Sequence, residues 1–275
     1  MEATLKDVLE SAYKEHRAVA HFNFRTLEDI EVFIEAASEL NTPIIIACGP
    51  KVFNTLGGKN IVGVYKSLVS CCRIPVVLHF DHATNLEEVW RAIGVGFTSV
   101  MIDGSLLPFE ENVRLTSTVV RVAKPAGVSV EGELGIVGGK EETLVRTEES
   151  LYTDPAEACR FVAETGVDAL AVAVGSMHGF YKSTPKLSFE RIREINKAVN
   201  IPLVLHGGTG IPIEDIKRAI SLGIAKVNIG TEFRALIIQT YREFSQQVDD
   251  IVDIVSVVKE RLKDKAKELL QGINS

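Results

Sequence analysis

Short apolar runs rich in valine, isoleucine and leucine recur along the chain, each followed by a polar turn and a longer amphipathic stretch. The runs are continuous rather than alternating, which is typical of strands buried on both faces of a parallel sheet. Eight strands are predicted, at residues 18–23, 43–48, 75–81, 98–103, 128–133, 169–175, 202–207 and 225–230. Strand followed by helix, eight times over, predicts an α/β fold built as a single (β/α)8 TIM barrel; a doubly wound sheet fits less well.

Helical patterns lie between these strands, for example at residues 27–40, 85–96, 154–166 and 212–223. Two of them begin at Asp-Pro or Pro and end at Gly, as capped helices do. No linker interrupts the series, so residues 1–275 are interpreted as a single domain. The glycine-led, charged segment 138–153 predicts a mobile loop over the barrel mouth. Residues 249–271 predict an extra C-terminal amphipathic helix on the outside of the barrel or at an oligomer contact.

Composition narrows the function classes. A chain of 275 residues with 46% hydrophobic content can bury a large core. The net charge of −7 and the lack of a basic run argue against nucleic-acid binding. No apolar run is long enough to cross a bilayer, and the charged N-terminus does not resemble a signal peptide. The cysteines Cys48, Cys71, Cys72 and Cys159 are irregularly spaced and predict free thiols, so a cytoplasmic protein is expected.

The candidate chemistry begins with histidines that close apolar runs and open polar turns: His82, His178 and His206. Since the carboxyl ends of barrel strands meet at one face, these imidazoles are expected to converge. Three imidazoles leave a tetrahedral zinc ion with one open position, as in a catalytic site. His79 is interpreted as structural or as a support for the ligands, and His16 and His21 carry no comparable signal.

Carboxylates and glycine turns occur at the same strand ends. Asp81 precedes the first of these histidines and supplies an acid or base within reach of the metal. The glycine turns 206–210 and 228–231 follow the last two strands, where barrels commonly bind phosphate. Lys182 adds a positive charge, so a phosphorylated ligand is predicted.

Together these motifs resemble the class II, zinc-dependent ketose-bisphosphate aldolases, most closely the tagatose- and fructose-bisphosphate branch. The resemblance covers nearly the whole chain, through AHFNFRTLED, LHFDHATNLEEV, VMIDGSLLPFEENV, VEGELGIVGGKEE, YTDPAEACRF, LAVAVGSMHGFYK, LVLHGGTG and KVNIGTEF. It implies reversible cleavage of a ketose (bis)phosphate to dihydroxyacetone phosphate and an aldehyde through a zinc-stabilised enediolate. It also implies a role in carbohydrate metabolism such as glycolysis, and a homodimer or homotetramer.

The resemblance assigns roles to individual residues. It implies one Zn²⁺ per subunit on His82, His178 and His206, with Asp81 exchanging the proton of the C4 oxygen. Glu141, on the predicted mobile loop, matches the base that takes the donor's proton. Asp103 and Glu133 match carboxylates near the metal, as supports or alternate ligands. The implied substrate-binding residues are Asn23, Gly179, Lys182, Gly207, Gly208, Thr209, Asn228, Gly230 and Thr231. Several of these positions also bind Na⁺ or K⁺ in family members.

The aldehyde side departs from the family pattern. Gly49 stands where many members have a Ser or Thr near the far phosphate, and Lys140 replaces a carboxylate that is frequent in the fructose branch. Arg261 is a candidate for the far-anion contact. The aldehyde is therefore glyceraldehyde 3-phosphate or another, such as those of inositol or sulfosugar breakdown. C4 stereochemistry stays open, as does the choice of Zn²⁺ or Co²⁺.

Three other readings compete with a metal-dependent aldolase. Lys226 on the eighth strand could serve a Schiff-base aldolase, but this would leave the histidines without a role. A zinc hydrolase on a barrel lacks an early His-x-His pair here. A non-catalytic partner subunit is expected to have lost metal ligands, which this chain retains.

Overall fold

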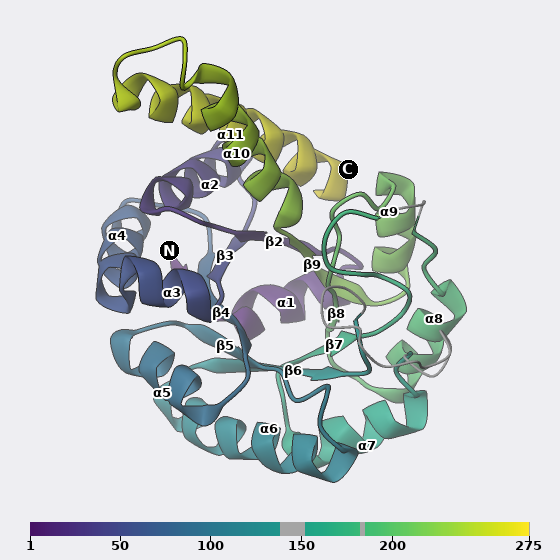
Figure 1. The fold of residues 1–275 in the computed structure, drawn as a ribbon. Coiled ribbons are helices and arrows are strands. Elements are labelled where there is room, and N and C mark those ends of the chain that lie inside the picture. The colour runs from purple at the N-terminus through teal and green to yellow at the C-terminus, as the bar shows by residue number, and fades with distance from the viewer. Residues whose placement is uncertain (138–151, 182–184, 275) are drawn as a thin grey trace.

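The computed structural model describes residues 1–137, 152–181 and 185–274. Strands β2 to β9 form a closed parallel barrel ringed by helices (Figure 1). Their bounds are β2 Val19–Asn23, β3 Ile44–Cys48, β4 Val76–Ala83, β5 Ser99–Ile102, β6 Ser129–Leu134, β7 Ala169–Val172, β8 Leu203–Leu205 and β9 Ile224–Ile229. Pairing of β4 with β5 and of β2 with β9 closes the ring, which confirms the predicted TIM barrel.

The helices are α1 Leu5–Lys14, α2 Leu27–Glu39, α3 Pro50–Leu56, α4 Gly58–Ser70, α5 Leu86–Val95, α6 Phe109–Ala123, α7 Pro155–Thr165, α8 Phe189–Ala198, α9 Ile213–Ser221, α10 Thr231–Phe244 and α11 Ile251–Asn274. A 3-10 turn, η1, covers Lys124–Ala126, and a short strand β1, Glu2–Ala3, pairs with β4. The four predicted helices are confirmed as α2, α5, α7 and α9. Capping explains the start of α7, where Asp154 accepts from two backbone amides.

The barrel interior changes from apolar to polar along its axis. At the amino ends of the strands, α1 inserts Leu5, Leu9 and Ala12 against strand residues such as Val77 and Val204. These residues are at most 4% exposed, so they close the barrel at this end. Polar side chains fill the interior nearer the carboxyl ends of the strands, which is the end where TIM barrels have their active sites.

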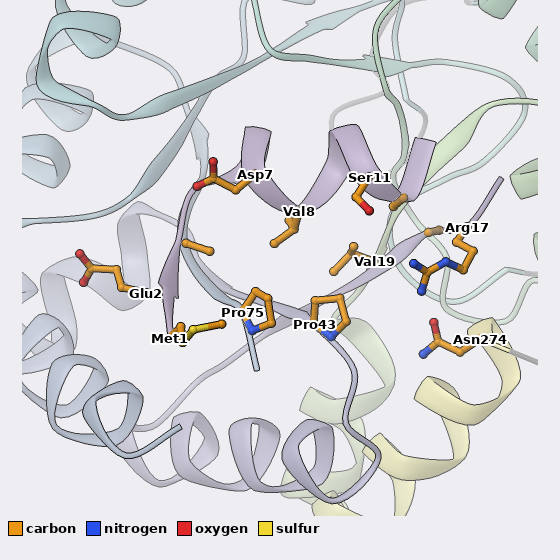
Figure 2. Close-up of a pocket in the computed structure, with 13 residues that line it drawn as sticks. Met1, Glu2, Asp7, Val8, Ser11, Arg17, Val19, Pro43, Pro75 and Asn274 are labelled. Carbon is orange, nitrogen blue, oxygen red and sulfur yellow. The ribbon is translucent and has the colours of Figure 1, made fainter. Parts of the chain in front are cut away.

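A hollow of about 440 Å³ lies at the amino-terminal end of the barrel, between β1, α1 and the starts of β2, β3 and β4 (Figure 2). Val8, Val19, Pro43 and Pro75 line it, with Arg17 at one side. None of the predicted site residues borders it. It therefore plays no part in the site at the opposite end.

The predicted C-terminal helix is confirmed as α11. Together with α10 it projects from the barrel beside α2 (Figure 1). Lys259 pairs with Glu31, and Lys263 with Glu39, each at 2.5 Å between nitrogen and carboxylate oxygen. These exposed pairs add little stability, and the buried face of α11 anchors it through Leu262, among others.

All eight strands differ from their predicted bounds by one or more residues, and the differences in β4 and β7 affect the site. β4 continues to Ala83, and its pairing with β5 shifts register where His82 adopts a left-handed φ of 51°. β7 ends at Val172 because both backbone groups of the next residue, Ala173, bond to Thr153 instead of to a neighbouring strand. His178 consequently lies on a loop six residues beyond the strand rather than at its end.

Candidate active site

The structure brings the three predicted histidines together at the barrel mouth. The ring centroids of His82 and His206 are 4.7 Å apart, those of His82 and His178 5.0 Å, and those of His178 and His206 5.6 Å. Each offers a ring nitrogen within 4.8 Å of the other two. Left-handed backbone is rare outside glycine, so the geometry of His82 is held against a local cost, which is common at functional sites.

Carboxylates fix which imidazole nitrogens face inward. Nε2 of His206 lies 2.9 Å from Oε1 of Glu131, and Nδ1 of His82 lies 3.2 Å from Oδ2 of Asp103. Ionised carboxylates only accept hydrogen bonds, so these nitrogens are the donors. The other two nitrogens, Nδ1 of His206 and Nε2 of His82, then face each other at 3.1 Å. Two lone pairs at this distance would repel each other, so either a proton on Nε2 of His82 or a metal cation must lie between the two nitrogens.

The charges around the cluster favour a cation too. Burial alone would lower the pKa of His82, but the carboxylates of Asp81, Asp103 and Glu133 outweigh it and raise that pKa to about 10. Burial and then the charge of Asp103 raise the pKa of Glu133. A centre of imidazoles and carboxylates that stabilises positive charge fits a divalent metal, and imidazole donors suit zinc.

An ion pair beneath the cluster supports His206. Nζ of Lys226 donates to Oε2 of Glu131 at 2.6 Å, and both side chains are fully buried. The same carboxylate therefore joins Lys226 to His206 and holds the imidazole in its tautomer. Lys226 is thus a structural partner rather than a nucleophile.

We expect Glu131→Gln to weaken metal binding by about 10- to 100-fold, the usual effect of losing a carboxylate behind a ligating histidine. It also leaves Lys226 buried and unpaired, which costs roughly 3–5 kcal/mol of unfolding free energy. The double variant Glu131→Gln/Lys226→Met should recover stability but not affinity. Chelator competition and thermal unfolding measure the two effects, with exposed Glu157→Gln as control. Wild-type affinity in the double variant would contradict the assignment.

Asp81 lies buried beside the histidine cluster. Its Oδ2 accepts from Nδ2 of Asn23 at 2.8 Å, while Oδ1 is buried without a hydrogen-bond partner among the described residues and lies 3.8 Å from Nε2 of His79. Burial opposes ionisation, but His82 and then His21 hold the pKa of Asp81 well below its usual range. The result is an ionised carboxylate with one free oxygen.

Sequence reasoning missed His21. It is fully buried, and its Nε2 lies 3.6 Å from Oδ2 of Asp81. Burial and then the Lys226 ammonium lower its pKa to about 4, so the ring is neutral. His21, His79 and Asp81 also offer three ligand atoms within 4.8 Å of one another, but the Lys226 charge opposes a cation there. His79 is a buried support whose Nδ1 contacts Oγ of Ser99 at 2.7 Å.

The predicted phosphate region lies between the ends of β7, β8 and β9. Gly207 has φ 67°, and a Cβ there would overlap the carbonyl oxygen of Met177. The Tyr181 hydroxyl joins the two loops, accepting from N of Met177 at 2.8 Å and donating to O of Gly207 at 3.0 Å. The helix α9 begins at Ile213, so the glycine turn 206–210 is separate from the first turn of that helix.

Unpartnered buried oxygens point to a ligand in this region. Oγ1 of Thr209 and Oδ1 of Asn228 are buried and have no hydrogen-bond partner in the part of the chain that the structure describes. The backbone N of Gly208 donates to O of Asn228 at 2.9 Å, which fixes the turn against β9. Gly230 packs so closely that a Cβ would lie 2.5 Å from Oδ1 of Asn23. The Thr209 hydroxyl can donate to a phosphate oxygen, whereas Oδ1 of Asn228 only accepts and suits a cation that accompanies the phosphate.

The remaining predicted residues fall in different places. Gly179 follows His178 with φ 102°, and Thr231 begins α10. Lys140, Glu141 and Lys182, with most of the predicted mobile loop, lie outside the described residues. Gly49 borders Asp81, since a Cβ there would be 3.3 Å from its carbonyl oxygen. Arg261 lies on α11 and bonds Thr240 and Glu243 of α10, so its predicted contact with a far anion stays a prediction.

The family model for class II fructose-bisphosphate aldolase matches residues 3–275. The chain belongs to this family. A curated fructose-bisphosphate aldolase of Geobacillus stearothermophilus is 45% identical over 253 residues, which is 91% of this chain and 88% of that protein. The protein is therefore an aldolase, a carbon–carbon lyase that cleaves a ketose bisphosphate, as the sequence motifs predicted.

Solved structures agree with this aldolase fold. The YdjI aldolase of Escherichia coli K12 superposes with a TM-score of 0.89 at 37% identity, covering 99% of this chain and 97% of that one. A putative fructose-1,6-bisphosphate aldolase of Coccidioides immitis gives 0.90 at 30% identity, with 98% and 95% covered. Membership of an aldolase family removes the hydrolase and partner-subunit interpretations. The family is generally metal-dependent, which removes the Schiff-base interpretation of Lys226. Among the described residues, no helix combines the length and apolarity needed to cross a membrane.

Proposed function

We propose that this aldolase reversibly cleaves a ketose bisphosphate to dihydroxyacetone phosphate and an aldehyde with Zn²⁺ bound by His82, His178 and His206. The observation that carries the proposal is the pair of facing imidazole nitrogens, 3.1 Å apart, whose other nitrogens are held by carboxylates. Three neutral ligands retain the full charge of the ion. When bound, the cation supplies polarisation of the donor's carbonyl and stabilises the negative charge of an enediolate.

Asp81 handles the proton of the C4 oxygen. In cleavage, its free Oδ1 accepts the C4 hydroxyl proton as the C3–C4 bond breaks, and in synthesis it returns that proton to the aldehyde oxygen. Asn23 holds the other carboxylate oxygen and so fixes the direction of Oδ1. The neutral rings of His21 and His79 fill the space beneath and exclude bulk water.

The donor's phosphate is proposed to lie on the glycine turns after β8 and β9. Its partners are Asn23, Gly179, Lys182, Gly207, Gly208, Thr209, Asn228, Gly230 and Thr231. The open oxygens of Thr209 and Asn228 suit a Na⁺ or K⁺ ion that accompanies the phosphate. Asp103 orients His82, and Glu133 is proposed either to support the histidine ligands or to bind the metal as an alternate ligand. We further propose a cytoplasmic homodimer or homotetramer.

Glu141 is proposed to transfer the C3 proton of the donor. We expect Glu141→Gln to lower the rate of C3 proton exchange in dihydroxyacetone phosphate by about 100-fold or more, the usual loss when a general base is removed. The neighbouring Glu142→Gln is the matched control and should change that rate little. NMR of the donor in D₂O measures the exchange. Equal losses in both variants would assign the effect to loop charge and refute the role of Glu141.

Metal removal tests the proposal as a whole. Cleavage of fructose 1,6-bisphosphate and of tagatose 1,6-bisphosphate is measured before and after chelation, and then after adding back Zn²⁺ or Co²⁺. We expect activity to disappear on chelation and to return with stoichiometric metal. Full activity in the metal-free protein would refute the proposal. The name of the Geobacillus relative favours fructose as the better substrate.

A further inference from the structure

His79, on β4, lies between two buried carboxylates beneath the predicted metal centre. Its Nε2 is 3.8 Å from Oδ1 of Asp81 and 3.7 Å from Oε2 of Glu131. Both distances are longer than a hydrogen bond, and this nitrogen has no hydrogen-bond partner among the described residues. His21 packs edge to face against the ring, with centroids 5.5 Å apart, and so limits its movement. Whether Nε2 carries a proton or a lone pair therefore decides how it acts on both carboxylates.

The hydroxyl of Ser99, on β5, indicates which nitrogen of His79 carries the proton. Burial and then the Lys226 ammonium keep the pKa of His79 well below its usual value, so the ring is neutral and has one N–H. Oγ of Ser99 lies 2.7 Å from Nδ1, and within the described part of the chain this is the only hydrogen bond of that hydroxyl. A buried hydroxyl with a single neighbouring acceptor donates to it. Nδ1 therefore accepts, and the ring proton is on Nε2.

The two carboxylates favour the same tautomer. Asp81 is ionised, as described above. Burial opposes ionisation of Glu131, but the Lys226 ammonium holds its pKa below the usual range. A lone pair on Nε2 would face an oxygen of each carboxylate, which is repulsive in a buried site of low dielectric. A proton on Nε2 instead attracts both oxygens, so the hydroxyl and the carboxylates agree.

An N–H beside Oδ1 restrains the rotation of the Asp81 carboxylate. Asn23, on β2, donates to the other oxygen, Oδ2, at 2.8 Å, so donors from two strands act on the two oxygens. A carboxylate oxygen has two lone pairs. Oδ1 can therefore face the His79 N–H with one lone pair and accept the C4 hydroxyl proton with the other. Proton transfer depends strongly on such orientation, because small misplacements of a reacting group slow catalysis.

We propose that His79 is a positioning residue for proton exchange at the C4 oxygen, and that Ser99 keeps the His79 N–H directed at Asp81. This inference rests on the proposed function. Neither His79 nor Ser99 touches the substrate, and neither gains or loses a proton in the reaction. Loss of either side chain should slow the step in which Asp81 acts and should spare proton exchange at C3 of the donor.

Two substitutions of His79 separate the effect of its N–H from that of its volume. His79→Leu fills a similar volume without a donor, whereas His79→Gln can place an amide N–H near the position of Nε2. Cleavage is measured with fructose or tagatose 1,6-bisphosphate, whichever the wild type cleaves faster. We expect kcat to fall about 100-fold in His79→Leu with little change in KM, the usual cost of a misplaced catalytic group. His79→Gln should recover most of this loss. C3 exchange in dihydroxyacetone phosphate and zinc content should stay close to wild type in both variants.

Ser99→Ala tests the second part of the proposal without changing the ring. It should lower kcat for cleavage by about 2- to 10-fold, the factor that corresponds to the loss of one hydrogen bond. Ser129→Ala is the matched control. Ser129 is buried at the paired position of β6, but its Oγ accepts from the backbone N of Lys6. This control should leave kcat unchanged, and an equal loss in both serine variants would overturn the role of Ser99.

¹⁵N NMR of zinc-loaded protein with labelled histidine measures the tautomer, because protonated and unprotonated ring nitrogens have well-separated chemical shifts. The signals missing from His79→Gln identify His79. We expect a protonated Nε2 and an unprotonated Nδ1, and a proton on Nδ1 would overturn the proposal. So would equal losses of cleavage and C3 exchange in folded His79→Leu, or a glutamine variant no better than the leucine variant. If His79→Leu does not fold, Ser99→Ala and the NMR spectrum decide. Cleavage and exchange by the wild type separate this failure from failure of the proposed function.

Discussion

Alanine in place of His178 should abolish both zinc binding and aldol cleavage while the fold is retained. His178 is exposed on the loop after β7, so its removal leaves no cavity in the core. A site with two imidazoles holds zinc far more weakly than one with three. Because the bound cation contributes several kcal/mol of transition-state stabilisation, kcat/KM should fall by about 1,000-fold or more.

Metal content per subunit, circular dichroism and cleavage rates distinguish loss of the metal site from loss of the fold. The control His16→Asn removes an exposed histidine at φ 52°, a conformation that asparagine tolerates, and should change none of the three. A folded His178→Ala protein that keeps stoichiometric zinc and wild-type activity would remove His178 from the metal centre.

Asp81→Asn should have the second large effect. We expect kcat for cleavage to fall by about 100- to 10,000-fold, because the amide cannot accept the C4 hydroxyl proton. The volume is unchanged, and the Asn23 amide can still donate to the side-chain oxygen, so the fold should persist. Exchange at C3 of dihydroxyacetone phosphate should suffer much less, since Asp81 does not act on that carbon.

Comparing cleavage with exchange in one preparation makes this prediction specific. If Asp81→Asn lowered both rates equally, the carboxylate would act through the metal centre as a whole rather than through one oxygen. The zinc content of the variant then has to be measured, because loss of the ion would lower the cleavage rate and the exchange rate equally. Retained zinc with unchanged cleavage would refute the role of Asp81.

The barrel could be predicted because its signals are local. Continuous apolar runs mark buried parallel strands, and the caps of α5 and α7 mark helix ends. The convergence of His82, His178 and His206 followed from the topology alone, since strand ends of a barrel share a face. By contrast, α3, α4 and β1 were not predicted. Gly57 separates α3 from α4, which interrupts the helical periodicity, and β1 has only two residues, too few to show a strand pattern.

The layer beneath the metal centre was harder to predict. Glu131, Lys226 and His21 lie inside apparently apolar strands, and their pairing depends on register between strands far apart in sequence. A signal was nevertheless present. Glu131 and Glu133 differ by two positions, as do His21 and Asn23, and this spacing puts each pair on one face of a strand. The positive φ of His82 could not be predicted, because only a few per cent of residues other than glycine adopt it and no neighbouring glycine or turn motif marks the position.

The most direct measurement is deuterium exchange at C3 of dihydroxyacetone phosphate in D₂O, followed by NMR with zinc-loaded protein and with protein stripped by chelator. No aldehyde is needed, so the result depends only on the donor, the metal centre and the base. The account predicts exchange that requires the metal and returns when zinc is added back. No exchange in folded, zinc-replete protein, or equal exchange without metal, would contradict it.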